Sequence, residues 1–239
     1  MSRETVRLMA MDTTTSAGSV ALVTEQGILS ERFLRSGINH SRRLLSTIDS
    51  MLSEAGWDKK GISAIAVCRG PGSFTGLRIG VSTAAGLAYG LKKPLFGVGS
   101  LDAIAMNFPF AQYPVCPVID ARKLQVFAAV YVSGPDGRLK KERDAVSVDP
   151  EKLAMSLTGE VILAGDGLRL YSAVFRRVMG QRARFAPENL WYSRASIVGL
   201  AALERYLAGE MPAPDELRAE YVRLSDAELN AKSGGEHGA

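Results

Sequence analysis

The sequence predicts an α/β protein made of two similar subdomains with a cleft between them. Strand-like and helix-like segments alternate along most of its 239 residues, and the plan of the first half restarts near residue 115. An apolar content of 46% is enough for a sizeable core. We expect an N-terminal subdomain at 1–110, a C-terminal subdomain at 111–230, and a disordered polar tail at 231–239.

The first half begins with a predicted meander of three strands, at 6–11, 17–24 and 28–34. A helix at 41–55 follows, with Ser41 as its candidate N-cap, apolar residues at helical spacing and Gly56 at its end. The pattern continues with a strand at 62–67, a helix at 74–91, a strand at 95–98 and a helix that opens at Ser100.

The second half repeats this order. Strands are predicted at 115–119, 124–132, 138–148 and 161–164, and helices at 168–179 and 193–207. When the sequence is shifted by 108 positions, Asp12 falls on Asp120, so each half places an aspartate at the tip of its first strand. Few positions are identical, and a chance similarity between two apolar meanders is the alternative to duplication.

The composition excludes several classes of protein. No run of about 18 apolar residues occurs, and the N-terminus lacks the apolar stretch of a secretory signal, so we expect a cytoplasmic protein without membrane contact. The two cysteines, Cys68 and Cys116, are far apart and are predicted to be reduced core residues. A net charge of +4, without a basic block interleaved with aromatic residues, argues against a dedicated nucleic-acid module.

A glycine-rich segment at 68–80, CRGPGSFTGLRIG, follows the predicted strand at 62–67. A Walker loop requires G-x-x-x-x-G-K-[ST], but Pro71 stands five positions before Gly76, and Leu77 follows it. The dinucleotide pattern G-x-G-x-x-G fails as well, because Thr75 occupies the third glycine position. The segment is therefore not predicted to be a conventional phosphate loop.

The predicted helix at 74–91 carries two seams at helical spacing. One is apolar and is expected to face the protein's own sheet; it consists of Leu77, Val81, Ala84, Ala88 and Leu91. The other is made mostly of small residues, namely Gly76, Gly80, Thr83, Leu87 and Gly90. Small residues let another backbone approach closely. The second seam therefore indicates either close packing within the chain or a docking face for another chain.

Five segments together resemble a known family. They are 11–15, 40–41, 69–80, 118–122 and 221–228. Over residues 6 to 228 the sequence resembles the TsaB/YeaZ family, bacterial subunits that help install threonylcarbamoyl on the adenosine beside the tRNA anticodon. The resemblance implies the duplicated fold of actin, sugar kinases and the heat-shock chaperone ATPases, and the role of a non-catalytic assembly subunit.

The resemblance also implies partners. These are the catalytic paralogue TsaD, a second copy of the chain when TsaD is absent, and the ATPase TsaE, with tRNA contacted only through the complex. The implied docking surface lies on the leucine-rich helix and the glycine-turn helix. Its residues are Leu44, Leu45, Ile48, Gly70, Pro71, Gly72, Ser73, Phe74, Thr75, Gly76, Arg78, Gly80, Thr83 and Leu87. On this reading Gly80→Leu is expected to leave the chain folded and to abolish its complex with TsaD.

No catalytic residue and no metal site are expected. In the catalytic paralogue two histidines four positions apart hold a metal, whereas the corresponding positions here are Ser100 and Ile104. The chain has only two histidines, His40 and His237, too few for a glycoprotease-type zinc site. Before a helix, His40 is predicted to be a surface residue rather than a general base.

The candidates for nucleotide contact follow from the superfamily fold. They are the turn residues Asp12, Thr13, Thr14 and Thr15, with Asp120 in the second half. We predict at most weak ATP or ADP binding, alone or at a subunit interface, and no required cofactor, because no glycine follows Asp120 to close on a phosphate. Turn capping by Asp12 and Asp120 is the structural alternative. Two other functions stay open: an actin-like ATPase or small-molecule kinase working in the interdomain cleft, and a direct tRNA-binding module.

Overall fold

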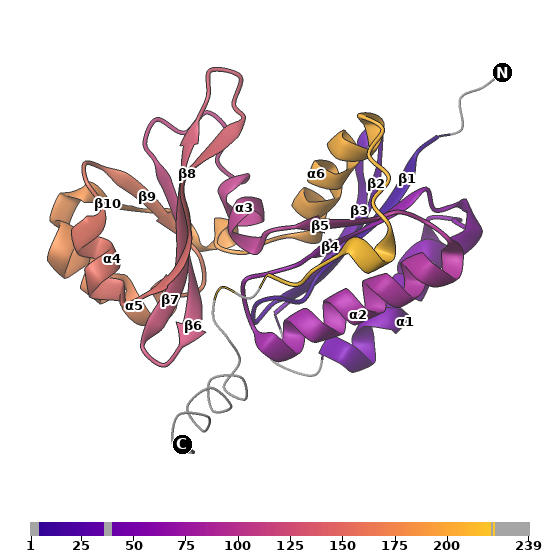
Figure 1. The fold of residues 1–239 in the computed structure, drawn as a ribbon, viewed down its shortest axis with the longest axis horizontal. Coiled ribbons are helices and arrows are strands. Elements are labelled where there is room, and N and C mark those ends of the chain that lie inside the picture. Colours follow the sequence, from indigo (N-terminus) through magenta and orange to yellow (C-terminus); the bar gives the residue numbers. More distant parts are fainter. Residues whose placement is uncertain (1–4, 36–39, 221, 223–239) are drawn as a thin grey trace, which may run out of the picture.

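The computed structural model describes residues 5–35, 40–220 and 222, with the side chains of 40–42 excepted. The expected disordered tail at 231–239 and nearly all of the 221–228 segment lie outside these residues. Two five-stranded sheets stand beside each other, each covered by helices (Figure 1). None of the helices in the described ranges is long and apolar enough to cross a membrane.

The first sheet holds β1 (Arg7–Asp12), β2 (Gly18–Thr24), β3 (Gly27–Leu34), β4 (Ala64–Cys68) and β5 (Leu95–Val98). Its order is β3-β2-β1-β4-β5, with an antiparallel meander followed by two parallel strands. Helices α1 (His40–Glu54) and α2 (Phe74–Leu91) cover one face, and α6 (Ala195–Leu207) covers the other. Successive side chains of β1 therefore enter different clusters: Leu8 and Ala10 face α6, while Met9 and Met11 face α1 and α2.

The second sheet holds β6 (Val115–Arg122), β7 (Gln125–Ser133), β8 (Leu139–Val148), β9 (Val161–Ala164) and β10 (Ala183–Phe185). Read from its other edge, its order is β8-β7-β6-β9-β10, which matches the order β3-β2-β1-β4-β5 of the first sheet strand for strand. Helices α4 (Pro150–Ser156) and α5 (Leu168–Met179) occupy the chain positions that α1 and α2 occupy in the first half. The shared topology confirms the duplicated α/β fold.

The two halves exchange their last helices. α3 (Ser100–Ala105) follows β5 in the chain but packs mainly on β6 and β7, whereas α6 follows β10 but packs on β1, β2 and β4. A division at 110/111 therefore assigns both helices to the wrong sheet. The unit built around the first sheet therefore includes α6 at residues 195–207, and the unit built around the second sheet includes α3 at residues 100–105. Apolar spacing shows that a helix is covered, but not which sheet covers it.

The ends of α1 and α2 follow from local signals. α2 begins at Phe74 because Ser73 Oγ accepts a hydrogen bond from the amide of Gly76, and it ends with Lys92 in the left-handed region, at φ 54°. α1 begins at His40, one residue earlier than predicted, and the side chain of Ser41, the predicted cap, lies outside the described residues.

Candidate functional site

The turn after β1 is closed by the glycine segment that follows β4. These strands are neighbours and parallel, so both chains leave the sheet at the same edge. The amide of Ser73 donates to the carbonyl oxygen of Thr14 at 2.6 Å, and Thr13 Oγ1 donates to the carbonyl oxygen of Gly76 at 2.6 Å. The strand tip and the glycine turn are thus joined directly by hydrogen bonds between their own residues.

Three glycines permit this closure. A Cβ atom on Gly72 or Gly76 would stand closer than 3.0 Å to the carbonyl oxygen of Thr14 or Thr13, respectively, and one on Gly80 would equally overlap Thr13 Oγ1. The small-residue seam is therefore turned, at Gly76 and Gly80, toward Thr13 of the same chain. Because a side chain at position 80 would overlap Thr13 Oγ1, Gly80→Leu is expected to disturb the fold as well as docking. Farther along α2, Gly86 and Gly90 have no atom within 4 Å of a Cβ position.

The predicted docking residues divide into a buried and an exposed set. Leu44 and Ile48 pack in the core beneath α1 and α2, and Gly70 and Pro71 are buried as well. The residues with exposed or half-buried side chains are Leu45, Ser73, Phe74, Thr75, Arg78, Thr83 and Leu87. We call this exposed set the α1–α2 face.

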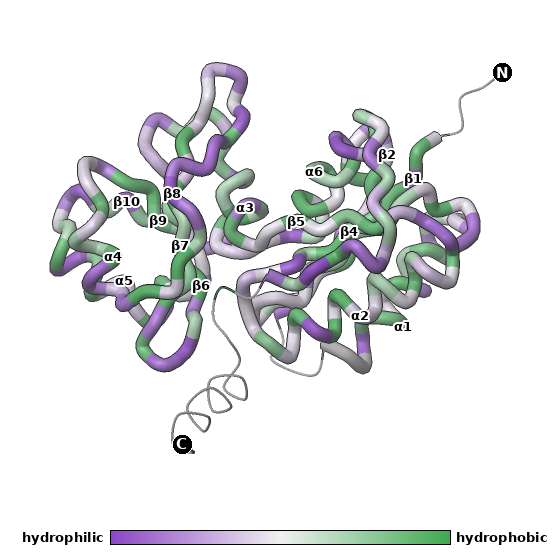
Figure 2. The backbone as a smooth tube through the Cα atoms, viewed as in Figure 1, coloured by the Kyte–Doolittle hydropathy of each residue, from purple (hydrophilic) through white to green (hydrophobic). Residues whose placement is uncertain are grey.

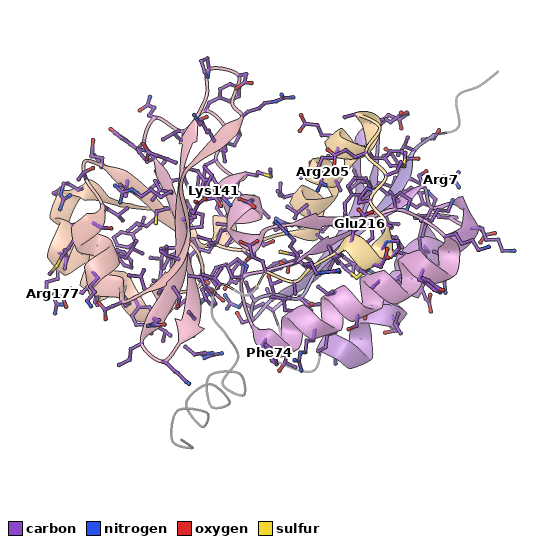
Figure 3. The ribbon with its side chains drawn as sticks, in the orientation of Figure 1. Arg7, Phe74, Lys141, Arg177, Arg205 and Glu216 are labelled. Carbon is purple, nitrogen blue, oxygen red and sulfur yellow. The ribbon has the colours of Figure 1, made fainter. Side chains whose placement is uncertain are left out.

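Phe74 marks the beginning of the α1–α2 face. It lies at the end of α2 nearer the second sheet (Figure 3). The guanidinium of Arg78 lies 3.9 Å from the centroid of its ring, so the arginine stacks on Phe74.

Asp12 caps its own turn from a fully buried position. Its side chain is 1% exposed, and its Oδ1 accepts hydrogen bonds from the amide and the hydroxyl of Thr14, at 2.8 and 2.7 Å. Its Oδ2 has no hydrogen-bond partner among the described residues. Burial raises the pKa of Asp12 above its ordinary value, and the bonds from Thr14 lower it in part. The bonds from Thr14 show Asp12 in the turn-capping role.

The second half contains a matching junction, including one residue that the sequence prediction missed. Asp120 Oδ1 accepts from the amide of Arg122 at 2.9 Å, and its other oxygen pairs with that arginine's guanidinium at 3.2 Å. Asp166, after β9, accepts from the amide of Asp120 at 3.4 Å, and backbone hydrogen bonds from Asp120 and Ser16 partly offset the burial that raises its pKa. Its flanking glycines, at 165 and 167, follow β9 directly, much as Gly70 and Gly72 follow β4 after one intervening residue. The recurrence of two glycines one residue apart after each of these strands was the sequence signal that could have identified Asp166.

The backbone of Ser16, in the turn of the first sheet, contributes to lowering the pKa of Asp166 in the turn of the second sheet. Within the described ranges, no three His, Cys, Asp or Glu side chains form a group that could hold a metal ion. Ser100 and Ile104 are buried, and Ser100 Oγ donates to the carbonyl oxygen of Pro71.

Asp12→Asn is expected to raise the free energy of unfolding at neutral pH by about 1 kcal/mol, because the amide keeps the bonds to Thr14 and removes a buried charge. In the native protein the raised pKa makes the folded state bind a proton that the unfolded state releases. Stability is therefore present below the unfolded value of 3.8 and is lost as the pH rises through the folded value. Urea unfolding of both proteins at a series of pH values measures this slope, and the variant should lack the part that Asp12 contributes.

The matched control for this prediction is Asp12→Ala, which also removes the charge but breaks both bonds to Thr14. We expect it to be less stable than Asp12→Asn. Equal stabilities of the two variants would show that the cap contributes nothing.

Comparisons with known proteins find relatives over most of the chain. A family model described as tRNA N6-adenosine threonylcarbamoyltransferase, TsaD, matches residues 27–230. The tRNA threonylcarbamoyladenosine biosynthesis protein TsaB of Bacillus subtilis is 28% identical over 226 residues, which are 92% of this chain and 96% of that protein. The protein of the same name from Escherichia coli is 35% identical over 167 residues, 68% of this chain and 72% of that protein.

Solved structures agree with these matches. YeaZ from Pseudomonas aeruginosa superposes with a TM-score of 0.78 at 29% identity, and the match covers 90% of this chain and 99% of that one. A second Pseudomonas aeruginosa structure, described as similar to peptidase YEAZ, gives a TM-score of 0.79 at 28% identity, covering 91% and 100%.

Proposed function

Since this chain belongs to the TsaB/YeaZ family within the wider TsaD family, we propose that it serves tRNA threonylcarbamoyladenosine biosynthesis as a non-catalytic assembly subunit that binds TsaD through the α1–α2 face. On this proposal the same face pairs with a second copy of the chain when TsaD is absent. The ATPase TsaE joins the assembly in the cytoplasm, and tRNA is contacted only through the complex.

One observation carries the docking proposal: α2 is a surface helix with almost no charge. Its 18 residues include a single charged side chain, Arg78, whereas its counterpart α5 carries Arg169, Arg176 and Arg177 in 12 residues. A helix that is solvated on one side normally places charged and polar residues there. Leu45 on α1 is also 52% exposed and Phe74 is 38% exposed. The composition of α2 therefore favours a covering partner.

Leu45→Glu is expected to weaken the complex with TsaD by about tenfold or more, because it places a charge in an apolar contact. The measurement is size-exclusion co-elution of the full chain with TsaD, followed by titration calorimetry. An unchanged affinity of the variant for TsaD would contradict the docking proposal.

The control for Leu45→Glu is a matching substitution on α4, the helix of the second unit that corresponds to α1. Met155 on α4 is 65% exposed, so Met155→Glu makes the same kind of change on the second unit. We expect it to leave the complex intact. Calorimetry of the isolated chain with Mg-ATP tests the rival ATPase or kinase function: tight binding with turnover that Asp12→Ala abolishes would favour the enzyme.

A further inference from the structure

The two sheets end in edge strands of opposite character. β3 and β8 hold the same place, at the outer side of each meander. β8 carries five consecutive charged residues at 140–144 and is largely hydrophilic (Figure 2). β3 instead exposes apolar side chains, with exposed fractions between 37% and 52%, namely Ile28, Leu29, Phe33 and Leu34. Charges on an edge strand prevent pairing with other chains, and β3 lacks that protection.

The two charged residues of β3 are engaged within the chain. Glu31 accepts from the amide of Ser196 at 3.0 Å and pairs with Arg194, and Arg32 bonds Ser50 and Glu54 of α1. Along β3, backbone hydrogen bonds within the described residues run only to β2. Among the described residues, none pairs with the outer row of backbone donors and acceptors of β3.

The side chains of β3 alternate between two faces. Arg32 reaches α1, whereas Glu31 reaches α6 and Phe33 packs edge-on against Tyr192, with ring centroids 5.5 Å apart. From Ser30 to Leu34, even-numbered residues thus face α1 and odd-numbered residues face the opposite side. A bulge at Leu22/Val23 shifts this alternation, so that Ile28 lies opposite Val23 of the α6 side.

A groove accompanies the strand on each of these faces. On the α1 side a groove of about 410 Å³ is lined partly by Val20, Leu34, Arg43 and Leu44. On the opposite side a groove of about 430 Å³ is lined by Phe33, Arg35, Glu188, Asn189, Tyr192 and Arg194. A strand added to β3 would point alternate side chains toward these two grooves.

The grooves differ in chemistry. The first has apolar walls from Val20, Leu34 and Leu44, and its rim also carries polar side chains and the charged residues Glu31, Arg32 and Arg43. The second has more guanidinium groups than carboxylates, since Arg35 and Arg169 share the single carboxylate of Glu188, while Arg194 pairs with Glu31. An apolar side chain suits the first groove, and a carboxylate suits the second.

We propose that the edge of β3 binds an extended peptide strand of another protein, whose alternate side chains are apolar toward α1 and acidic toward Arg35 and Arg194. Main-chain hydrogen bonds to β3 supply affinity, and the two grooves supply the sequence preference. This surface is separate from the α1–α2 face, so it admits a partner other than the one docked there.

The test uses the full chain and a defined probe, a fluorescein-labelled peptide of sequence Val-Glu-Val-Glu-Val-Glu. We expect saturable binding by fluorescence anisotropy and slower hydrogen exchange at alternate amides of β3. Two peptides serve as controls: Val-Val-Val-Glu-Glu-Glu, which has the same composition, and Val-Lys-Val-Lys-Val-Lys, which has the opposite charge. Each should bind about tenfold or more weakly. Equal affinity for all three peptides, or no saturable binding of the first, would overturn the proposal.

Leu34→Lys puts a charge at the mouth of the apolar groove and is expected to weaken probe binding about tenfold. Its matched control is Val146→Lys at the equivalent edge, β8, where Val146 is also exposed; this variant should bind the probe normally. Equal losses in both variants would contradict the assignment to β3. Analytical ultracentrifugation gives one further outcome. If the chain forms a dimer that Leu34→Lys dissociates, the occupant of β3 is a second copy of the chain, and the proposal of a peptide from another protein is overturned.

Discussion

Gly76→Ala is expected to lower the free energy of unfolding by about 3 kcal/mol or more. Any Cβ at this position would overlap the carbonyl oxygen of Thr13, which is held in place by the hydrogen-bonded turn after β1. Neither backbone can move without opening the contact between that turn and α2. Urea unfolding followed by circular dichroism measures the loss.

The control is the same substitution ten residues farther along the same helix. Gly86 has nothing within 4 Å of a Cβ position, so Gly86→Ala removes only the cost of glycine in a helix and should stabilise the protein by up to about 1 kcal/mol. The two variants are thus expected to shift stability in opposite directions. Shifts of the same sign and size would mean that the glycine segment does not close on the β1–β2 turn.

Repetition and spacing predicted much of the fold. The limits of α2 at 74 and 91 were predictable, because Ser73 before the helix and the apolar seam along it are local signals. The duplication was predictable from Asp12 and Asp120, since equivalent strands begin 108 residues apart, at 7 and 115. Each of these features depends on residues close in sequence or on a constant shift between halves.

What escaped prediction depends on contacts between distant segments. The spacing of Gly76 and Gly80 shows that something approaches α2 closely, but Thr13, more than 60 residues earlier, is what approaches. The docking residues Leu44 and Ile48 have the same apolar character as Leu45, yet only the packing shows that they are buried. Asp166 was missed because the shift of 108 positions that relates Asp12 to Asp120 does not place its turn on Gly70–Gly72. The two turns correspond only in the folded structure, where each follows an equivalent strand.

The exchange of α3 and α6 leads to the prediction with the largest effect: a fragment of residues 1–110 is expected not to fold. It lacks α6, whose Ala195, Val198 and Ala202 are fully buried against the first sheet. It also retains α3, whose Leu101 and Ile104 would lose the second sheet that covers them. Exposure of both apolar surfaces removes the main stabilising contribution. Thermal and urea scans should show no cooperative transition.

Mixing the fragment with residues 111–239 is expected to restore a cooperative transition, because each fragment carries the helix that the other one needs. The decisive control lies in α6. A Cβ on Gly199 would stand 2.7 Å from Val23 Cγ2, so a 111–239 fragment with Gly199→Leu should fail to complement. One with Leu207→Gln, at an exposed position of the same helix, should succeed. Cooperative unfolding of 1–110 alone would instead mean that the first sheet is stable without α6. The two halves would then be independent units, and the exchanged helices would serve only to hold them together.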